Sequence, residues 1–268
     1  MQETAFAKLN LALHVRGKER DGYHRIETIF AFCQEGDLLA VEEADELSLA
    51  VSGPFGHELS SGEDNLAMLA ARALAEMAGI TRGAALTLEK RLPVSAGLGG
   101  GSADAGAALR LLCRWWDIDP PAAALHELAA RLGADVPACL YSRPARGEGR
   151  GDRLQAWGGE DLAGASLLLV NPGTPLSTAA VFAGWEGEDK GPLGSLEGSR
   201  NDLEPAALAL VPEIADMLAS LSAARLARMS GSGATCFGLF DDAAMRDAAA
   251  AQIREAHPFW WQLSTRLR

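Results

Sequence analysis

The sequence lacks several features that define broad classes of protein. Its four cysteines form no CxxC pair and its five histidines form no HExxH motif, so zinc and disulfide chemistry is not expected. No run approaches the roughly 18 unbroken apolar residues of a membrane span. The first ten residues, MQETAFAKLN, have no basic head followed by an apolar stretch, which a secretory signal requires. We therefore expect a cytoplasmic protein without a membrane partner.

Positive charge is also scarce. Lysine and arginine number 24 against 36 aspartates and glutamates, which gives a formal net charge of −12 with histidine neutral. A protein that binds nucleic acid or an anionic membrane over a broad surface presents clustered positive charge. The balance therefore argues against nucleic acid as a partner, although it leaves room for a local basic site. No fixed-period repeat is visible, which excludes solenoids and propellers.

The 268 residues mix strand-like and helix-like segments, and 48% of them are hydrophobic, which suits one large domain or two intimate ones. In the strand-like run 5–15, Lys8 and Asn10 share a polar face. A helix begins near Ser102, which we take as its cap. Further strands are expected at 37–43, 46–51, 84–90, 166–171, 225–229 and 234–240, and helices at 65–78, 122–132, 204–222 and 242–256. The glycine-rich stretch 144–164 indicates an inter-domain connection or a hairpin.

A glycine-rich loop joins an expected strand to the helix that follows it. The segment PVSAGLGGGS at 93–102 places four glycines in five positions, 97 to 101. Such a loop lets the backbone approach a ligand, and its N–H groups with the helix N-terminus form a cradle for phosphate. It is not a Walker loop, because no Gly-Lys-Ser/Thr ends it, and it lacks the last glycine of GxGxxG. A purely structural turn is the alternative.

Lys8 and Asp135 are candidates for chemistry on a hydroxyl group. Asp135 follows Gly133, where a helix gives way to a turn, and a carboxylate there could orient an acceptor hydroxyl. Lys8 lies in an otherwise apolar strand, where an unpaired buried lysine would cost free energy. Each residue also has a plainer interpretation, since Asp135 could bond its own turn and Lys8 could be an exposed charge on an edge strand.

Taken together, these segments resemble the GHMP kinase superfamily. The resemblance rests on AKLNL at 7–11, RDGYH at 20–24, EDNL at 63–66, PVSAGLGGGS at 93–102, GADVP at 133–137, NPG at 171–173, NDLE at 201–204 and SGSGAT at 230–235. The glycine loop is typical of the superfamily. AKLNL, DGYH and GADVP, in this order, are similar to its branch that acts on a cytidine diphosphate-linked methylerythritol. The family usually has Gly, Ser and Ala where this chain has Ser95, Ala103 and Gly106.

The resemblance implies an α+β, two-domain fold with the active site in a cleft between an N-terminal ATP-binding domain, 1–150, and a C-terminal α/β domain, 151–268. It implies transfer of the ATP γ-phosphoryl group to the 2-hydroxyl of that substrate, with Mg²⁺ bridging phosphate oxygens, in non-mevalonate isoprenoid synthesis. The partner would be a small molecule, and the chain a monomer or a weak homodimer. Two alternatives stay open: another GHMP kinase, acting on homoserine, mevalonate or a sugar, and a non-catalytic nucleotide sensor.

By the same resemblance, Lys8 and Asp135 are catalytic and Ser102 meets Mg²⁺. An aromatic ring can stack on a pyrimidine and an imidazole can hydrogen-bond its edge. The implied substrate-binding residues are Asn10, Tyr23, His24 and Phe182. The implied ATP-binding residues are Asn65, Pro93, Val94, Ser95, Ala96, Gly97, Leu98, Gly99, Gly100, Gly101, Ser102 and Ala103. Without the resemblance, Asn65 is a helix N-cap and Tyr23 and His24 are a half-buried loop pair.

Overall fold

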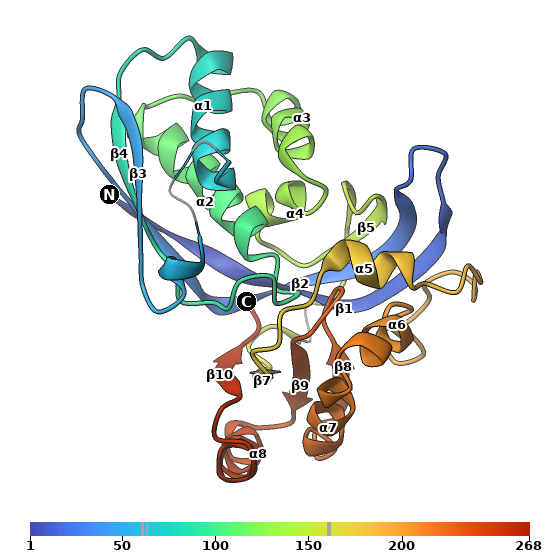
Figure 1. Cartoon of the computed structure of the whole chain (residues 1–268). Coiled ribbons are helices and arrows are strands. Elements are labelled where there is room, and N and C mark those ends of the chain that lie inside the picture. The colour runs from blue at the N-terminus through green and yellow to red at the C-terminus, as the bar shows by residue number, and fades with distance from the viewer. Residues whose placement is uncertain (60–61, 63, 160–161) are drawn as a thin grey trace. The chain divides into compact units, whose positions relative to one another are not determined.

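The computed structural model describes residues 1–59, 62, 64–159 and 162–268, which divide into two compact units (Figure 1). The first unit comprises Met1–Lys8, Glu35–Val94 and Gly99–Ser142, and the second comprises Leu9–Gln34, Ser95–Leu98 and Arg143–Arg268. Strands β1 (Gln2–Lys18) and β2 (His24–Glu42) are long enough to contribute residues to both units. Glu63, the first residue of the EDNL segment, lies outside the described residues.

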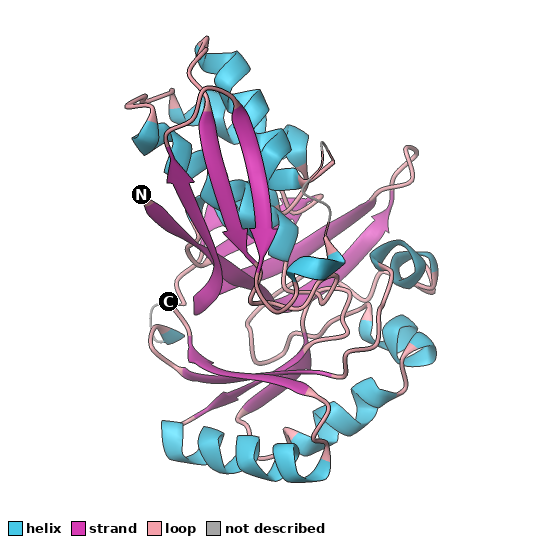
Figure 2. Ribbon diagram, turned by 60° about the vertical axis from the view of Figure 1, so that its left-hand side comes forward, coloured by secondary structure: helices cyan, strands magenta, loops and turns pink. Residues whose placement is uncertain are grey.

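The first unit has a layer of strands with helices on one side. Strand β3 (Leu47–Ser52) runs parallel to β4 (Ala84–Glu89), and β4 pairs antiparallel with the end of β2. Its helices are α1 (Leu66–Ala78), α2 (Gly100–Trp115), α3 (Ala122–Leu132) and α4 (Val136–Tyr141), with a short 3-10 helix, η1 (Gly56–Glu58). Figures 1 and 2 show α1 to α4 on one side of β3 and β4. The apolar residues that alternate along β4, Leu86 and Leu88, are buried.

The second unit contains an antiparallel sheet in the order β10-β7-β9-β8. Its elements are β5 (Ala145–Gly149), β6 (Arg153–Ala156), β7 (Ser166–Asn171), α5 (Thr178–Ala183), α6 (Glu204–Leu210), α7 (Glu213–Ser220), β8 (Leu226–Met229), β9 (Cys236–Phe240), α8 (Ala243–Ala256) and β10 (Trp261–Arg266). Helices α7 and α8 cover one face of this sheet (Figure 1), where Leu168, Val170, Ile214 and Ile253 share one hydrophobic core. Strand β5 pairs with the beginning of β2 and forms a hairpin with β6.

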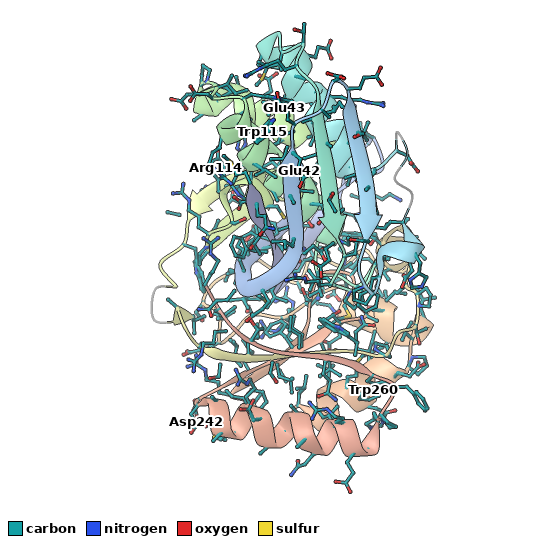
Figure 3. All side chains as sticks on the ribbon, turned by 90° about the vertical axis from the view of Figure 1, so that its left-hand side faces the viewer. Glu42, Glu43, Arg114, Trp115, Asp242 and Trp260 are labelled. Carbon is teal, nitrogen blue, oxygen red and sulfur yellow. The ribbon has the colours of Figure 1, made fainter. Side chains whose placement is uncertain are left out.

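Helix α8 shows how local residues set the ends of an element. Asp242 caps its first turn, because the Asp242 Oδ1 accepts a hydrogen bond from the Met245 N–H at 2.8 Å. The helix ends before His257, whose ring stacks on Trp260 with 3.6 Å between the ring centroids. Figure 3 shows Asp242 and Trp260 at opposite ends of this helix.

The α+β class and most of the expected elements are confirmed, with two corrections. Ser102 does not cap α2, because Gly99 adopts a left-handed conformation at φ 61° and the helix already begins at Gly100. The helix expected at 204–222 is divided into α6 and α7, because Pro212 interrupts it. None of the four cysteines, all of which lie within the described residues, forms a disulfide. Within the described residues, no helix combines the length and the apolar character needed to cross a membrane.

Candidate active site

The structure brings Lys8 and Asp135 together in the first unit. The Lys8 Nζ lies 3.0 Å from the Asp135 Oδ2, and the lysine side chain is 3% exposed whereas the aspartate is 31% exposed. Lys8 comes from β1, between the fully buried Ala7 and Leu9. Asp135 occupies the N-cap position of α4, yet its side chain makes no capping hydrogen bond. The pair therefore combines a covered ammonium with a carboxylate that solvent can reach.

Arg110 of α2 fixes α4, the helix that follows Asp135. Its Nη1 donates to the carbonyl oxygens of Cys139 at 2.6 Å and Leu140 at 3.1 Å, and to the Ser142 hydroxyl at 3.1 Å. These acceptors lie at the C-terminal end of α4, where carbonyl groups have no partner within the helix. This role of Arg110 was not predicted from the sequence. The signal that the sequence carries is a charged side chain between Leu109 and Leu111, in an apolar stretch of helix.

The beginning of α2 lies directly against Lys8. A Cβ atom placed on Gly99 would stand 2.6 Å from the Lys8 Cε, so only glycine leaves room for the lysine stem. The first N–H groups of an α-helix have no acceptor within the helix, and here they belong to Gly100, Gly101 and Ser102. The first unit thus places anion-binding donors beside the buried ammonium.

Asn65 belongs to the same part of the first unit. It caps α1, since its Oδ1 accepts a hydrogen bond from the Ala67 N–H at 3.0 Å. The next residue, Leu66, has its Cδ1 3.3 Å from the position that a Cβ on Gly101 would take. The plain capping interpretation is therefore correct, and the residue after Asn65, Leu66, lies against the first turn of α2. Its role toward ATP stays a prediction.

The middle of the glycine loop, residues 95–98, contacts the SGSGAT turn within the second unit. The Ser230 hydroxyl donates to the Gly97 carbonyl at 2.9 Å, and the Thr235 N–H donates to the Ala96 carbonyl at 3.2 Å. Asn10 joins the same network, because its backbone N–H donates to the Ser230 Oγ at 3.2 Å. Its side chain donates to Thr28 at 2.8 Å. The turn at 230–235 therefore supports the loop.

The second unit places His24 against Phe182 and Trp185, and the role of His24 and Phe182 toward a base stays a prediction. The His24 ring lies 5.0 Å from Phe182, at an interplanar angle of 34°, and 5.6 Å from Trp185, which meets it edge-on. Burial, together with the nearby charge of Lys18, lowers the pKa of His24 below its ordinary value. The neutral imidazole then keeps one hydrogen-bond donor and one acceptor, which suits the polar edge of a base.

Tyr23 is placed differently from its neighbour His24. The residue is 53% exposed, and the Arg150 guanidinium lies over its ring at 3.9 Å from the ring centroid. Arg150 also forms an ion pair with Asp21, whose carboxylate accepts a hydrogen bond from the Tyr23 backbone N–H. Sequence reasoning did not single out Arg150. Its position on the turn between β5 and β6 gave no indication of contact with the DGYH segment.

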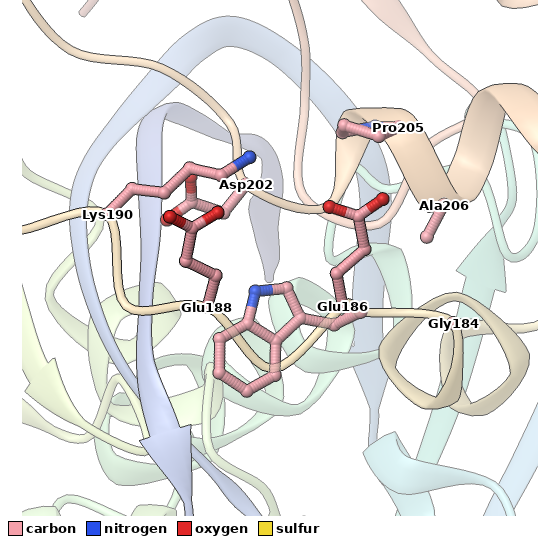
Figure 4. Close-up of a pocket in the computed structure, with 8 residues that line it drawn as sticks. Gly184, Glu186, Glu188, Lys190, Asp202, Pro205 and Ala206 are labelled. Carbon is pink, nitrogen blue, oxygen red and sulfur yellow. The ribbon is translucent and has the colours of Figure 1, made fainter.

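The second unit also has a pocket, whose lining includes Trp185, the residue that contacts His24. It is lined by Gly184, Trp185, Glu186, Glu188, Lys190, Asp202, Pro205 and Ala206 (Figure 4). Three carboxylates and one lysine belong to this lining, so the pocket is a poor site for phosphate. Among the described residues, no group of three or more histidine, cysteine, aspartate or glutamate side chains is arranged to hold a metal ion.

Comparison with known proteins identifies the family of this chain. Family models described as the GHMP kinases N terminal domain and GHMP kinases C terminal match residues 65–143 and 186–258. A protein of Rhizorhabdus wittichii named 4-diphosphocytidyl-2-C-methyl-D-erythritol kinase is 51% identical over 278 residues, which cover 99% of this chain and 94% of that protein. A protein of Sphingopyxis alaskensis with the same name is 48% identical and covers 100% of this chain and 99% of its own length.

Solved structures show the same relationship. A crystal structure of 4-(cytidine 5'-diphospho)-2C-methyl-D-erythritol kinase has a TM-score of 0.83 at 35% identity, over 100% of this chain and 99% of that one. Mevalonate kinase from Methanococcus jannaschii has a TM-score of 0.72 at 10% identity, over 100% of this chain and 98% of its own, which shows a shared fold alone. The chain belongs to the GHMP kinase family and, within it, to the 4-diphosphocytidyl-2-C-methyl-D-erythritol kinases.

Proposed function

We propose that the protein transfers the γ-phosphoryl group of ATP to the 2-hydroxyl of 4-diphosphocytidyl-2-C-methyl-D-erythritol, a step of isoprenoid precursor synthesis. The observation that carries the chemistry is the Lys8–Asp135 pair, with 3.0 Å between its charged atoms and with only the carboxylate open to solvent. The substrate follows from membership of the family and from the His24–Phe182 pair. The kinases that act on homoserine, mevalonate or a sugar share only their fold with this chain.

In this mechanism Asp135 accepts the hydrogen bond of the acceptor hydroxyl and takes its proton as the oxygen attacks the γ-phosphorus. The bond from phosphorus to the β–γ bridging oxygen breaks, and ADP leaves. The Lys8 ammonium offsets the negative charge around the carboxylate and the transferring group. Asn10, two residues beyond Lys8 on β1, supports the acceptor by hydrogen bonding.

ATP-dependent transfer is the reaction of the GHMP kinase family. We assign the phosphates to the glycine loop, 93–103, with the N–H groups at the start of α2 as donors. Mg²⁺ usually takes one or two protein oxygens and several phosphate or water oxygens. The Ser102 hydroxyl lies in the first turn of α2. It could supply the one protein oxygen that such a cation needs, so a cluster of carboxylates is not required. Bound there, Mg²⁺ would neutralise charge on the phosphate oxygens.

The remaining site assignments follow from the second unit. We assign the cytosine base to His24 and Phe182, with the neutral imidazole on its polar edge, and Tyr23 to the same base. Three further statements stay predictions. They are the division into an ATP-binding domain, 1–150, and a second domain, 151–268; the absence of nucleic-acid binding; and a monomeric or weakly dimeric state.

The test is an assay that couples ADP release to a readable signal, with the cytidylyl methylerythritol, homoserine, mevalonate and galactose as acceptors. Asp135→Asn and Lys8→Met should each lower kcat by at least about 10²-fold, because both residues act on transfer, and leave ATP affinity within about twofold. Asp119→Asn is the matched control, since it removes an exposed carboxylate of the same unit. Normal turnover in Asp135→Asn would refute the mechanism. Turnover with another acceptor alone would refute the substrate.

A further inference from the structure

Three charged side chains of the first unit, none of them part of the Lys8–Asp135 pair, meet in its interior. Lys90 follows β4, Asp37 lies on β2 and Asp104 lies on α2, and their side chains are 2%, 0% and 2% exposed. The Lys90 Nζ donates to the Asp37 Oδ2 and, at 2.7 Å, to the Asp104 Oδ2. We call these residues the Lys90 cluster. The mechanism proposed above uses none of them.

The Lys90 cluster holds the chain on the entry side of the glycine loop. The other oxygen of Asp37, Oδ1, accepts hydrogen bonds from the backbone N–H of Arg91 at 2.6 Å and from that of Leu92 at 2.9 Å. These two residues lead directly into Pro93, where the loop begins. One carboxylate therefore fixes the direction in which the chain enters the loop.

The same cluster holds the exit side. Asp104 lies in the second turn of α2, just after the residues whose N–H groups have no acceptor within the helix. Gly100, the first residue of α2, is close to the ammonium as well, since a Cβ placed on it would stand 3.4 Å from the Lys90 Nζ. Through Lys90, the Asp37 carboxylate is thus tied to both stems of the loop.

Stability alone does not account for such a cluster. Desolvation of buried charges offsets most of their mutual attraction, so buried ion pairs are often no more stabilising than apolar side chains of similar size. A loop with four glycines, by contrast, has many accessible conformations, and ordering it on binding costs conformational entropy. Fixed stems reduce that cost before the ligand arrives.

We propose that Lys90, Asp37 and Asp104 are positioning residues that clamp the two stems of the glycine loop and so hold its N–H donors ready for the phosphates of ATP. This rests on the proposed function in one respect, namely that the loop binds ATP. The clamp acts through the loop and touches neither substrate. Its loss should therefore weaken ATP binding and leave recognition of the cytidylyl substrate intact.

The experiment measures the Kd of ATP by titration calorimetry and the KM of each substrate for Lys90→Met, Asp104→Ala and Asp104→Asn. We expect the ATP Kd to rise about tenfold in the first two variants and less in Asp104→Asn, whose amide oxygen still accepts from Lys90. The KM of the cytidylyl substrate should stay within about twofold. The double variant Lys90→Met, Asp104→Ala should have an ATP Kd no higher than that of whichever single variant binds ATP more weakly. Either change alone opens the same clamp.

Leu74→Ala is the control for a general loss of stability, because Leu74 is fully buried in α1 and lies outside the loop and the cluster. It should unfold more easily and bind ATP normally. A folded Lys90→Met or Asp104→Ala variant with the wild-type ATP Kd would overturn the proposal. So would an equal rise in both KM values. If Lys90→Met does not fold, the test is whether the ATP Kd of Asp104→Ala is higher than that of Asp104→Asn.

Amide hydrogen exchange separates failure of the clamp from failure of the proposed function. In Lys90→Met, which removes the ammonium that holds the Asp37 carboxylate, the amides of Arg91 and Leu92 should exchange faster than in Leu74→Ala, whether or not ATP is the ligand. Unchanged exchange would overturn the clamp. Faster exchange in a protein whose wild type does not bind ATP would retain the clamp and refute the function assigned to the loop.

Discussion

Replacing Gly99 with alanine tests whether the glycine loop places Lys8. Gly99 has φ 61°, and a Cβ added there would stand 2.6 Å from the Lys8 Cε. Non-bonded carbon atoms normally approach to about 3.5 Å, so the contact requires a displacement of about 1 Å. Lys8 is 3% exposed and paired with Asp135, so it has little free space in which to absorb this movement without disturbing the pair.

Two effects of the Gly99→Ala substitution can be separated in magnitude. The left-handed backbone costs a non-glycine residue about 1–2 kcal/mol, which should appear as a loss of unfolding free energy. A misplacement of about 1 Å at a reacting group lowers turnover by about 10²-fold. We therefore expect a modestly less stable protein whose kcat falls far more than its stability explains.

Gly79→Ala is the matched control for the backbone effect alone. Gly79 ends α1 with φ 64°, and a Cβ placed there has no heavy atom within 4 Å. This variant should lose about 1 kcal/mol in urea unfolding and keep its turnover in the ADP-release assay at saturating substrates. If the two alanine variants had the same kcat, the placement of Lys8 by Gly99 would be refuted.

Three further predictions concern stability. Ser95 has φ 53°, so Ser95→Gly should raise the unfolding free energy by up to about 1 kcal/mol in urea titration, and a loss would contradict the strain. Burial, more than the charge of Arg200, lowers the pKa of His14 below 6.5, so its unfolded form binds the extra proton. Stability should therefore fall below about pH 6.5 by up to about 1.4 kcal/mol per pH unit, and His14→Gln should remove this component; an unchanged slope would contradict it. Asp242→Ala should lose about 1 kcal/mol in thermal unfolding with normal KM values, and an unchanged midpoint would exclude the cap.

Local signals explain why parts of the site were predictable. The N-cap Asn65 and the left-handed Gly79 at the two ends of α1 are set by residues next to them in sequence. The four glycines within 97–101 likewise predict a loop whose backbone lies close to another group. The pairing of Lys8 with Asp135 was predictable in a different way, because it came from resemblance to a family, and no spacing in the sequence implies it.

The features that sequence reasoning missed depend on contacts between distant residues. Lys90 and Asp37 are 53 positions apart, and Asp37 reads in sequence as an ordinary charge before an apolar strand. From the sequence, Arg110 is expected on the surface of its helix. Its contacts with α4 become evident only in the folded structure. The error at Ser102 has a local origin, since a left-handed Gly99 allows the helix to begin at Gly100, two residues earlier than a serine cap would allow.

The two buried lysines show how an acidic protein can serve anionic ligands. The chain has only four lysines, and two of them, Lys8 and Lys90, are 3% and 2% exposed. The Lys90 ammonium lies between two buried carboxylates, so its charge is neutralised inside the unit and can act only on the placement of the loop. Lys8 pairs with a carboxylate that is 31% exposed, so this pair remains open to a substrate. Exposure of the partner carboxylate, more than burial of the lysine, therefore separates the lysine that we propose to position the loop from the lysine that we propose to be catalytic.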